Sequence, residues 1–389
     1  MIFRGRKMSD ISKEGINTLI RKLRKPIAFL LIFGLLSTIR VPVLAAILTD
    51  EVEMIRYRWN TVDNRYEESD RLKSRYNILE MQGKIKKWKQ YKYLYNKQYK
   101  GLEIVDYLGT GKKLSIPAKI KGQKVCVLGE ACFANDKKLT EVTMPDTIVE
   151  IKNYAFAGTG IKKIKLSKHL KKIGEGTFYR CEKLKKLKLP DSLKSTGLAF
   201  LANTGITSIV IPKNCTTCSL DYAPKLKKVQ FASGWKGNSI EGFSGTAIKK
   251  IAVSGNIEKI LCGSLQECNN LTSVDIAKKG KDLIIEDSAF CDSTALKEIT
   301  IPKRVKRIGI HAFSGCTSLK KVIFEGDVPK GYEGYGEGYW TDEEGAMAKV
   351  FDGISPNAKF YVKKTYYNHY KEVFEEQGWY LDTMQIIAR

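Results

Sequence analysis

The stretch Leu296 to Ser318, LKEITIPKRVKRIGIHAFSGCTS, decides the fold, because most of the chain consists of approximate copies of it. Ile299 and Ile301 alternate with polar residues, a pattern typical of a short strand with one buried face. Pro302 cannot donate a hydrogen bond to a sheet, so we expect the strand to end there. A unit this short cannot bury Phe313 together with its aliphatic residues, so it needs neighbouring copies to form a core.

The copies recur at spacings of 22, 23, 22, 20, 22, 23, 25 and 23 residues. They start at Leu139, Ile161, Leu184, Ile206, Leu226, Ile248, Leu271, Leu296 and Leu319, and an earlier copy begins at about Gly111. An aromatic residue recurs in the same register, at Phe133, Phe156, Phe178, Phe200, Phe243, Phe290 and Phe313. This periodicity predicts a repeat solenoid, mainly β with short turns, of about ten coils of 20–25 residues.

The consensus LKxIxIPxxVxxIxxxAFxxC resembles the BspA-type leucine-rich repeat family of bacterial surface proteins. The resemblance covers about Tyr99 to Tyr370, including the opening DYLGTGKKLSIPAKIKG and the closing AKFYVKKTYYNHYKEVF. It implies a leucine-rich repeat fold and a role in adhesion or binding. The repeats from Ile206 to Gly245 have lost part of the consensus, so we expect irregular coils there.

Segments on either side of the repeats have patterns of their own. Residues 46–88 are charged and have a helical apolar period, which predicts a helical spacer; residues 89–110 alternate, which predicts a β-hairpin that caps the array. The solenoid should extend over 111–362, and residues 363–389 should form a helical cap and tail. The helix is predicted from Tyr366, Tyr370, Val373 and Phe374, which are spaced for one helical face.

An insertion at 325–349 interrupts the last repeat before the pattern resumes at Val350 and Phe351. It carries four aromatic residues among glycines and acidic residues: Tyr332, Tyr335, Tyr339 and Trp340. Insertions in solenoids form surface loops, often on a binding face. These aromatic residues are therefore candidates for ligand binding, and the alternative is a surface loop without a ligand.

Residues 1–45 predict export. Residues 1–25 carry eight Lys or Arg against two Asp or Glu, and the apolar run Ile27 to Ile39 is 13 residues long. Small residues at Val43 and Ala45 fit a signal-peptide cleavage site. The alternative is an uncleaved membrane anchor over 27–48, which Arg40 and Pro42 disfavour. We expect a secreted or cell-surface protein, with a membrane-anchored protein as the alternative.

The nine cysteines do not form a pattern that predicts disulfides. Cys181, Cys268 and Cys316 occupy one slot in three repeats, so we expect them to be small buried residues of a ladder. The single CxxC, Cys215 to Cys218, is a weak signal for a metal or redox site, and two inward strand positions are the favoured interpretation.

Enzyme motifs are absent from the sequence. The three histidines (His169, His311 and His369) lie in different repeats or caps, and no P-loop, Rossmann glycine pattern, G-x-S-x-G or H-E-x-x-H occurs. We therefore expect a protein that is not an enzyme and needs no cofactor or metal.

The formal charge of +25 is the main indication of function. Without residues 1–45 the chain keeps 58 Lys or Arg against 40 Asp or Glu. Several lysines fall on outward strand positions, and stacked coils should align them as a basic stripe: Lys163, Lys165, Lys186, Lys188, Lys228, Lys250 and Lys321. We expect the stripe to break at Glu298 and Thr300, beside the insertion.

The stripe predicts binding of extracellular proteins, anionic glycans or wall polymers, because such a field concentrates polyanions. Lys163, Lys165, Lys186, Lys188, Lys228 and Lys250 are its candidate ligand-binding residues. Nucleic acid is disfavoured by export and by the lack of a nucleic-acid-binding module. Two alternatives stay open: the lysines only keep the repeats soluble, or the chain is a membrane-anchored scaffold that displays repeats to partner proteins.

Overall fold

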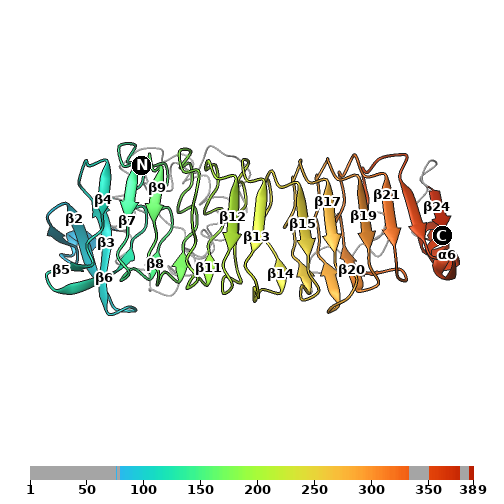
Figure 1. The fold of residues 1–389 in the computed structure, drawn as a ribbon, viewed down its shortest axis with the longest axis horizontal. Helices are drawn as coiled ribbons and strands as arrows, with labels where there is room; N and C mark the ends of the chain where they lie inside the picture. The colour runs from blue at the N-terminus through green and yellow to red at the C-terminus, as the bar shows by residue number, and fades with distance from the viewer. Residues whose placement is uncertain (1–75, 77–78, 333–349, 377–384) are drawn as a thin grey trace, which may run out of the picture. The chain divides into compact units, whose positions relative to one another are not determined.

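The computed structural model describes residues 76, 79–332, 350–376 and 385–389. These residues form a β-solenoid of about 11 turns with little helix. Its coils follow one another in sequence order in Figure 1, which confirms the predicted repeat solenoid. Residues 1–45 and most of the predicted helical spacer at 46–88 (46–75 and 77–78) lie outside the described residues.

The first strand of each coil lies on one side of the stack, which we call the first-strand face. Its strands are β4 (Lys113–Ser115), β7 (Glu141–Thr143), β9 (Lys163–Lys165), β12 (Ser208–Ile211), β13 (Lys228–Phe231), β15 (Lys250–Val253), β17 (Ser273–Ile276), β19 (Glu298–Ile301), β21 (Lys321–Phe324), β23 (Lys359–Val362) and β24 (Gln385–Ala388). They pair in parallel within four sheets. Ile299 and Ile301 of β19 align with Val322 and Phe324 of β21, so inward residues stack on one another. β19 ends immediately before Pro302, as predicted.

The second strands form another side of each coil. They are β6 (Gln123–Leu128), β8 (Glu150–Ile151), β10 (Lys172–Ile173), β11 (Ser195–Thr196), β14 (Ser239–Ile240), β16 (Lys259–Ile260), β18 (Leu283–Ile285), β20 (Val305–Gly309) and β22 (Lys330–Tyr332). This side is interrupted between β11 and β14, which belong to different sheets. The interruption lies in the coils that have lost the consensus, as predicted.

The turn that holds the repeated phenylalanine completes each coil and links it to the next. The N–H of Phe133 donates to the carbonyl of Ala155 at 2.9 Å, and the N–H of Phe313 donates to Val350 at 2.8 Å. The rings stack inside the array: Phe290 and Phe313 have centroids 5.0 Å apart, and Phe313 and Phe351 5.1 Å apart. The repeat pattern therefore resumes at Val350 and Phe351, as predicted.

An antiparallel extension covers the first coil. β2 (Tyr91–Asn96) and β3 (Gly101–Tyr107) form the hairpin, β3 pairs in parallel with β6, and β5 (Lys119–Ile120) pairs with β6 in the antiparallel sense. One expectation was wrong at its boundary: Lys86–Trp88, the end of the predicted helical spacer, form strand β1 against β2. Edge pairing with the hairpin overrides the weak helical period there.

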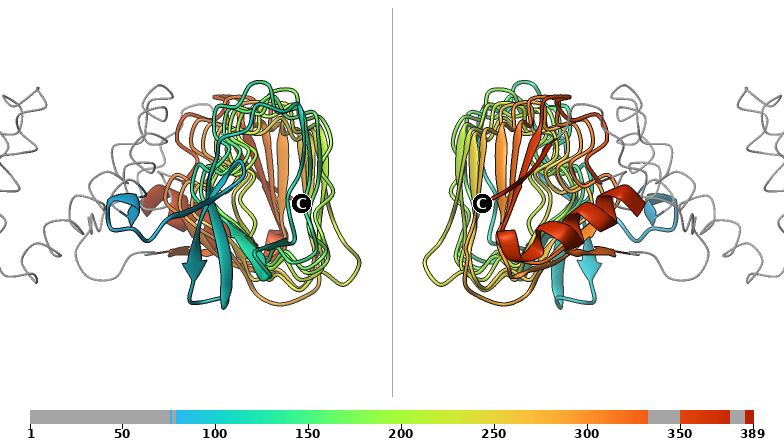
Figure 2. Two further views of the ribbon diagram at one scale, coloured as in Figure 1. Left: turned by 90° about the vertical axis from the view of Figure 1, so that its left-hand side faces the viewer. Right: turned by 90° about the vertical axis from the view of Figure 1, so that its right-hand side faces the viewer.

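The far end of the array is covered by η3 (Lys364–Tyr366) and helix α6 (Tyr367–Glu376), which crosses the last coils in Figure 2. Tyr370 and Phe374 are buried, as the apolar spacing predicts, and the helical cap is confirmed. The start of the predicted insertion was placed too early. Residues 330–332 form β22 beside β20, so the last coil keeps its second strand and the interruption follows it.

Candidate ligand-binding groove

The alternation of each first strand decides which side chains the first-strand face presents. In β15, Ile251 and Val253 are 8% and 0% exposed, whereas Lys250 and Ala252, which alternate with them, are exposed. All six candidate lysines are exposed: Lys163, Lys165, Lys186, Lys188, Lys228 and Lys250. Lys186 and Lys188 lie in a segment that has no regular strand, although they alternate with the buried Leu187 and Leu189.

Acidic residues of neighbouring coils pair with lysines at both ends of the predicted stripe. Glu141 of β7 lies between Lys113 and Lys163, and its carboxylate is 3.4 Å and 3.6 Å from the two ammonium groups. Lys321 pairs with Glu298 at 3.1 Å. The ion pair at Glu298 agrees with the break predicted there. The sequence prediction did not consider Glu141, which parallel pairing places beside Lys163 at the other end of the stripe.

A hollow of about 1090 Å³ runs along the first-strand face from β13 to β21 and reaches the end of β24. We call it the basic groove. Six of its lining residues are cationic and two are acidic: Lys227, Lys228, Lys249, Lys250, Lys278 and Arg389, with Asp275 and Glu325. Lys278 is paired with Glu325 at 2.7 Å. Within the described part of the chain, no acidic side chain lies within ion-pair distance of the four lysines of the β13 and β15 coils.

Two of the six candidate lysines, Lys228 and Lys250, line the basic groove, and the other four lie on the same face nearer the N-terminal end. Sequence reasoning missed Lys227 and Lys249, which stand immediately before the strands. The Lys-Lys pairs at 227–228 and at 249–250 could have indicated these two residues in the sequence. Arg389 could not be found from the repeat, because β24 joins the sheet without carrying the consensus.

The aromatic candidates of the insertion are not brought to the groove by any described contact. Tyr332 belongs to β22, on the second-strand side of the last coil. Tyr335, Tyr339 and Trp340 lie outside the described residues, so their assignment to a site stays a prediction.

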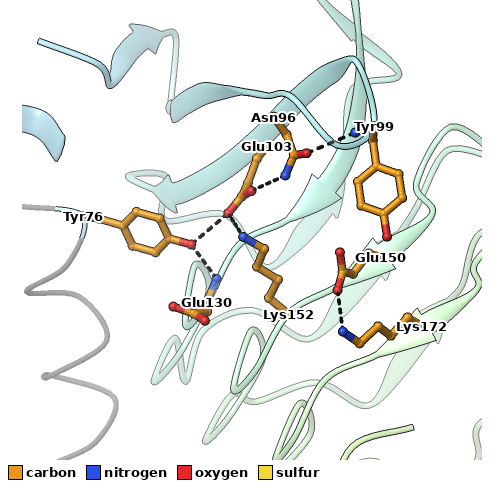
Figure 3. Close-up of polar contacts among 8 residues, drawn as sticks. All are labelled: Tyr76, Asn96, Tyr99, Glu103, Glu130, Glu150, Lys152 and Lys172. Carbon is orange, nitrogen blue, oxygen red and sulfur yellow. Dashed lines mark hydrogen bonds and ion pairs between the residues drawn. The ribbon is translucent and has the colours of Figure 1, made fainter. Parts of the chain in front are cut away.

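A buried polar cluster near the N-terminal end is the other concentration of charge (Figure 3). The Glu103 carboxylate accepts hydrogen bonds from Tyr76 Oη at 2.9 Å, Asn96 Nδ2 at 2.8 Å and Lys152 Nζ at 2.8 Å. Tyr76 Oη in turn accepts from the Glu130 N–H at 3.0 Å. Every one of these bonds is internal, so the cluster fastens Tyr76 to the first coils and offers no open site.

The predicted cysteine ladder is confirmed. Cys181, Cys268 and Cys316 are buried, and each thiol donates to the carbonyl of the phenylalanine one coil earlier, at 3.1, 3.1 and 3.2 Å. Cys215 and Cys218 are buried too, as predicted, but the prediction that they are strand residues was wrong, because neither lies in a strand. The interaction with Cys215 and, after it, burial raise the pKa of the Cys218 thiol. All nine cysteines are free.

Two of the three histidines make a polar side-chain contact, and the third lies at a turn position. His169 Nδ1 is 2.9 Å from the Asp146 carbonyl, His311 occupies a left-handed turn position with φ of 56°, and His369 contacts Asp327 at 2.7 Å. Over the described ranges, no three His, Cys, Asp or Glu side chains gather to hold a metal. Across those same residues, we find no helix with the length and apolarity that a membrane span requires.

Comparison with protein families gives one clear match. The model of the BspA type leucine rich repeat region matches in six copies, over residues 112–223, 218–320 and 283–333. No curated protein matches the chain in sequence.

Solved structures with similar folds come from several bacteria. A leucine rich cell surface protein of Faecalibacterium prausnitzii is 25% identical with a TM-score of 0.50, over 64% of this chain and 72% of that one. A leucine-rich repeat protein of Eubacterium ventriosum is 20% identical (TM-score 0.46, 71% and 77% covered). The pneumococcal vaccine antigen PcpA is 17% identical (TM-score 0.37, 78% and 98% covered).

Proposed function

We propose that this chain, which belongs to the BspA-type leucine-rich repeat family, is an exported binding protein of the cell surface or its surroundings. It binds anionic ligands, either acidic proteins or anionic glycans, on its first-strand face and does no chemistry on them. The observation that carries the proposal is the basic groove, where Lys227, Lys228, Lys249 and Lys250 come together with no ion-pair partner among the described residues.

Electrostatics favours a ligand there over a purely solubilising role for the four lysines. Elsewhere on the face, lysines such as Lys163 and Lys321 have a glutamate of a neighbouring coil within ion-pair distance, which lowers the local field. In the groove six cationic residues outnumber two acidic ones, and a hollow surface with such an excess of positive charge raises the local concentration of polyanions. Such attraction weakens as salt shortens the Debye length. The exposed Lys165, Lys186 and Lys188 would extend the field toward the N-terminal coils.

Surface location is supported by the family and by the relative from Faecalibacterium prausnitzii, which is described as a cell surface protein. It is also supported by the basic and apolar segments within residues 1–45. N-terminal sequencing of the exported protein tests this part: a chain that begins near Ala46 supports a cleaved signal peptide. A chain that retains residues 27–48 supports the membrane-anchored scaffold instead.

The binding proposal is tested with a groove variant in which Lys227, Lys228, Lys249 and Lys250 are changed to Ser. Retention on heparin and on immobilised poly-glutamate is measured as salt is raised. The matched control changes Lys84, Lys97, Lys119 and Lys124 to Ser, which are exposed residues at the N-terminal end. Both variants lose the same formal charge. We expect only the groove variant to elute at clearly lower salt, and equal losses in the two would show diffuse attraction and refute the site.

A further inference from the structure

The first-strand face breaks beside the basic groove. β12 pairs with β13 and β15 pairs with β17, each over four residues, whereas β13 and β15 belong to different sheets. The inward residues of β13, Val229 and Phe231, are accordingly only half-buried. The two coils are therefore not joined by a strand pair at this step, and the exposed fraction of Val229 and Phe231 shows that their packing is incomplete there.

One oversized residue explains the break. In the turn that follows the first side of seven coils, the N–H of an inward residue donates to a carbonyl three positions earlier, as Leu193 does to Pro190 and Val305 does to Pro302. The residues in this position are Ile148, Leu170, Leu193, Cys215, Trp235, Ile257 and Val305. Only Trp235 has an indole, and it contacts Phe231 with ring centroids 4.3 Å apart. A core packed for aliphatic side chains accommodates a larger one by shifting the backbone.

The break contains a cavity of about 230 Å³, which we call the anchor cavity. It is lined by Phe231, Ala232, Gly234, Trp235, Ile240, Ala252, Ser254, Asn256 and Ile257. Ala252 lines the basic groove as well, so the two hollows adjoin at β15. The lysines that precede and start β13 and β15 therefore lie on the strands that flank its opening.

Hydrogen bonds hold both walls of the anchor cavity in place. Trp235 Nε1 donates to the Cys215 carbonyl at 2.7 Å, which orients the indole. On the other wall, the guanidinium of Arg304 donates to the carbonyls of Ser254 at 3.1 Å and Ile257 at 2.9 Å. A preformed cavity of this kind binds without first ordering its own side chains.

We infer that the anchor cavity takes one large apolar side chain from an acidic segment of a partner protein, whose carboxylates contact Lys228 and Lys250 in the adjoining groove. The inference rests on the proposed function and names the ligand class of the same surface. Cavity size fits a single side chain: an apolar cavity of about 150 Å³ admits benzene, and pockets for whole drug-sized molecules run from about 300 Å³ upward. The lining is mostly apolar, which favours a leucine or phenylalanine over a sugar, since sugars require several polar partners.

The test uses the full mature chain and short synthetic peptides in which glutamates flank a central leucine, phenylalanine or alanine. Binding is measured by isothermal titration calorimetry at low salt. Burying a large apolar side chain should make the leucine and phenylalanine peptides bind about tenfold more tightly than the alanine peptide, or better. The variant Ala252→Leu fills the opening from an exposed, outward position and should abolish this preference. The control Thr143→Leu makes a similar change on β7, outside the groove, and should keep it.

Failure of this inference can be told apart from failure of the proposed function. If all three peptides bind equally and binding depends on Lys228 and Lys250, the basic groove stands and the anchor cavity is refuted. The same holds if Ala252→Leu keeps the preference for leucine. If Ala252→Leu weakens binding of heparin oligosaccharides and leaves binding of the peptides unaffected, the cavity binds a sugar and the inference is overturned. Peptide binding that is indifferent to all four groove lysines would refute the proposed function itself.

Discussion

The guanidinium of Arg304 donates a hydrogen bond from Nη1 to the carbonyl oxygen of Ile257 at 2.9 Å, 47 residues earlier in the chain. Nε and both Nη atoms together bond to the carbonyls of Ala277, Ile257, Lys281, Val253 and Ser254. The side chain is 5% exposed and spans three coils. The coil that contains Lys278 to Gly280 departs from the consensus spacing. Arg304 therefore replaces, with its side-chain hydrogen bonds, the regular backbone contacts of the turn in that coil.

Replacing Arg304 with methionine should destabilise the array by about 3 kcal/mol or more, because several buried carbonyls lose their donor at once. Urea denaturation measures the change, and hydrogen exchange should locate it at residues 253–257 and 277–281. Lys306→Met is the control. Lys306 is exposed, and its Nζ atom lies 3.8 Å from Oδ1 of Asp282; a surface ion pair of this kind contributes at most about 1 kcal/mol. Similar losses in the two variants would contradict the role assigned to Arg304.

The phenylalanine stack should make its members unequal in their contribution to stability. Phe313 has a parallel ring on each side, Phe290 and Phe351, whereas Phe200 is equally buried and has no ring partner among the described residues. Phe313→Ala should cost about 3–5 kcal/mol, and Phe200→Ala should cost less by about 1 kcal/mol, the typical gain from an aromatic pair. Chemical denaturation of both variants measures the difference. A larger cost at Phe200 would show that stacking does not contribute.

The cysteines should differ sharply in reactivity. Burial raises the pKa of Cys181 and of Cys268 to about 11 and that of Cys316 to about 12, so these thiols are both inaccessible and protonated at pH 8. Cys262 is exposed, and it should be alkylated first by iodoacetamide, followed by the half-exposed Cys291. Peptide mass mapping identifies the sites, with all nine cysteines reacting in denaturant as the control. Early modification at Cys316 would contradict the ladder.

The docking of the segment at Tyr76 onto the first coils should depend on a single group, the Tyr76 hydroxyl. Tyr76→Phe keeps the ring and removes the donor to Glu103 and the acceptor of the Glu130 N–H, which should weaken docking by about 1–2 kcal/mol. Hydrogen exchange at Gly83 and Lys84, whose N–H groups bond to Glu80 and Leu79, reports on docking. Tyr95→Phe removes a hydroxyl from a residue that is 53% exposed and should have no effect. Unchanged exchange in Tyr76→Phe would refute the fastening role.

Three partly buried carboxyls should cost stability at neutral pH, and this cost should disappear as pH falls toward about 4. Burial raises the pKa of Asp221 and Glu241 in the irregular coils, and also that of Asp287. A carboxyl with a raised folded pKa destabilises the fold above that pKa, and the penalty disappears as pH falls through it toward the unfolded value of about 4. Below that, Asp146 and Glu258, whose pKa values are lowered by the Lys168 N–H and by the Lys281 side chain, act in the opposite direction.

The variant Asp221→Asn with Glu241→Gln tests this pH dependence through thermal midpoints at pH 7 and pH 5. It should be stabilised at pH 7 and should gain less than the native chain on acidification, with Asp287 providing the remainder. A native midpoint that falls between pH 7 and pH 5 would show that these carboxyls do not control stability in that range.

The repeat could be predicted from the sequence because it depends on residues close together in the chain. Ile299 and Ile301 indicate their strand by alternation, and Phe313 and Cys316 indicate their turn by recurrence, so the inward residues and the solenoid follow from local pattern. The β1 strand was missed for the converse reason: Lys86–Trp88 is a strand only because the hairpin provides an edge to pair with.

Lysines on the outward positions were also visible in the sequence, but their grouping was not. Whether Lys163 is paired with Glu141, or Lys250 lines a groove with Lys228 and has no acidic partner among the residues described, depends on the coil that packs against each strand. Likewise Trp235 is one unusual residue in the sequence, and only packing shows that it separates β13 from β15. Sequence by itself determined the coil, because burial alternates along each short strand. Tertiary structure decided the groove and the cavity, because both are made by side chains about one repeat apart that meet only when coils stack.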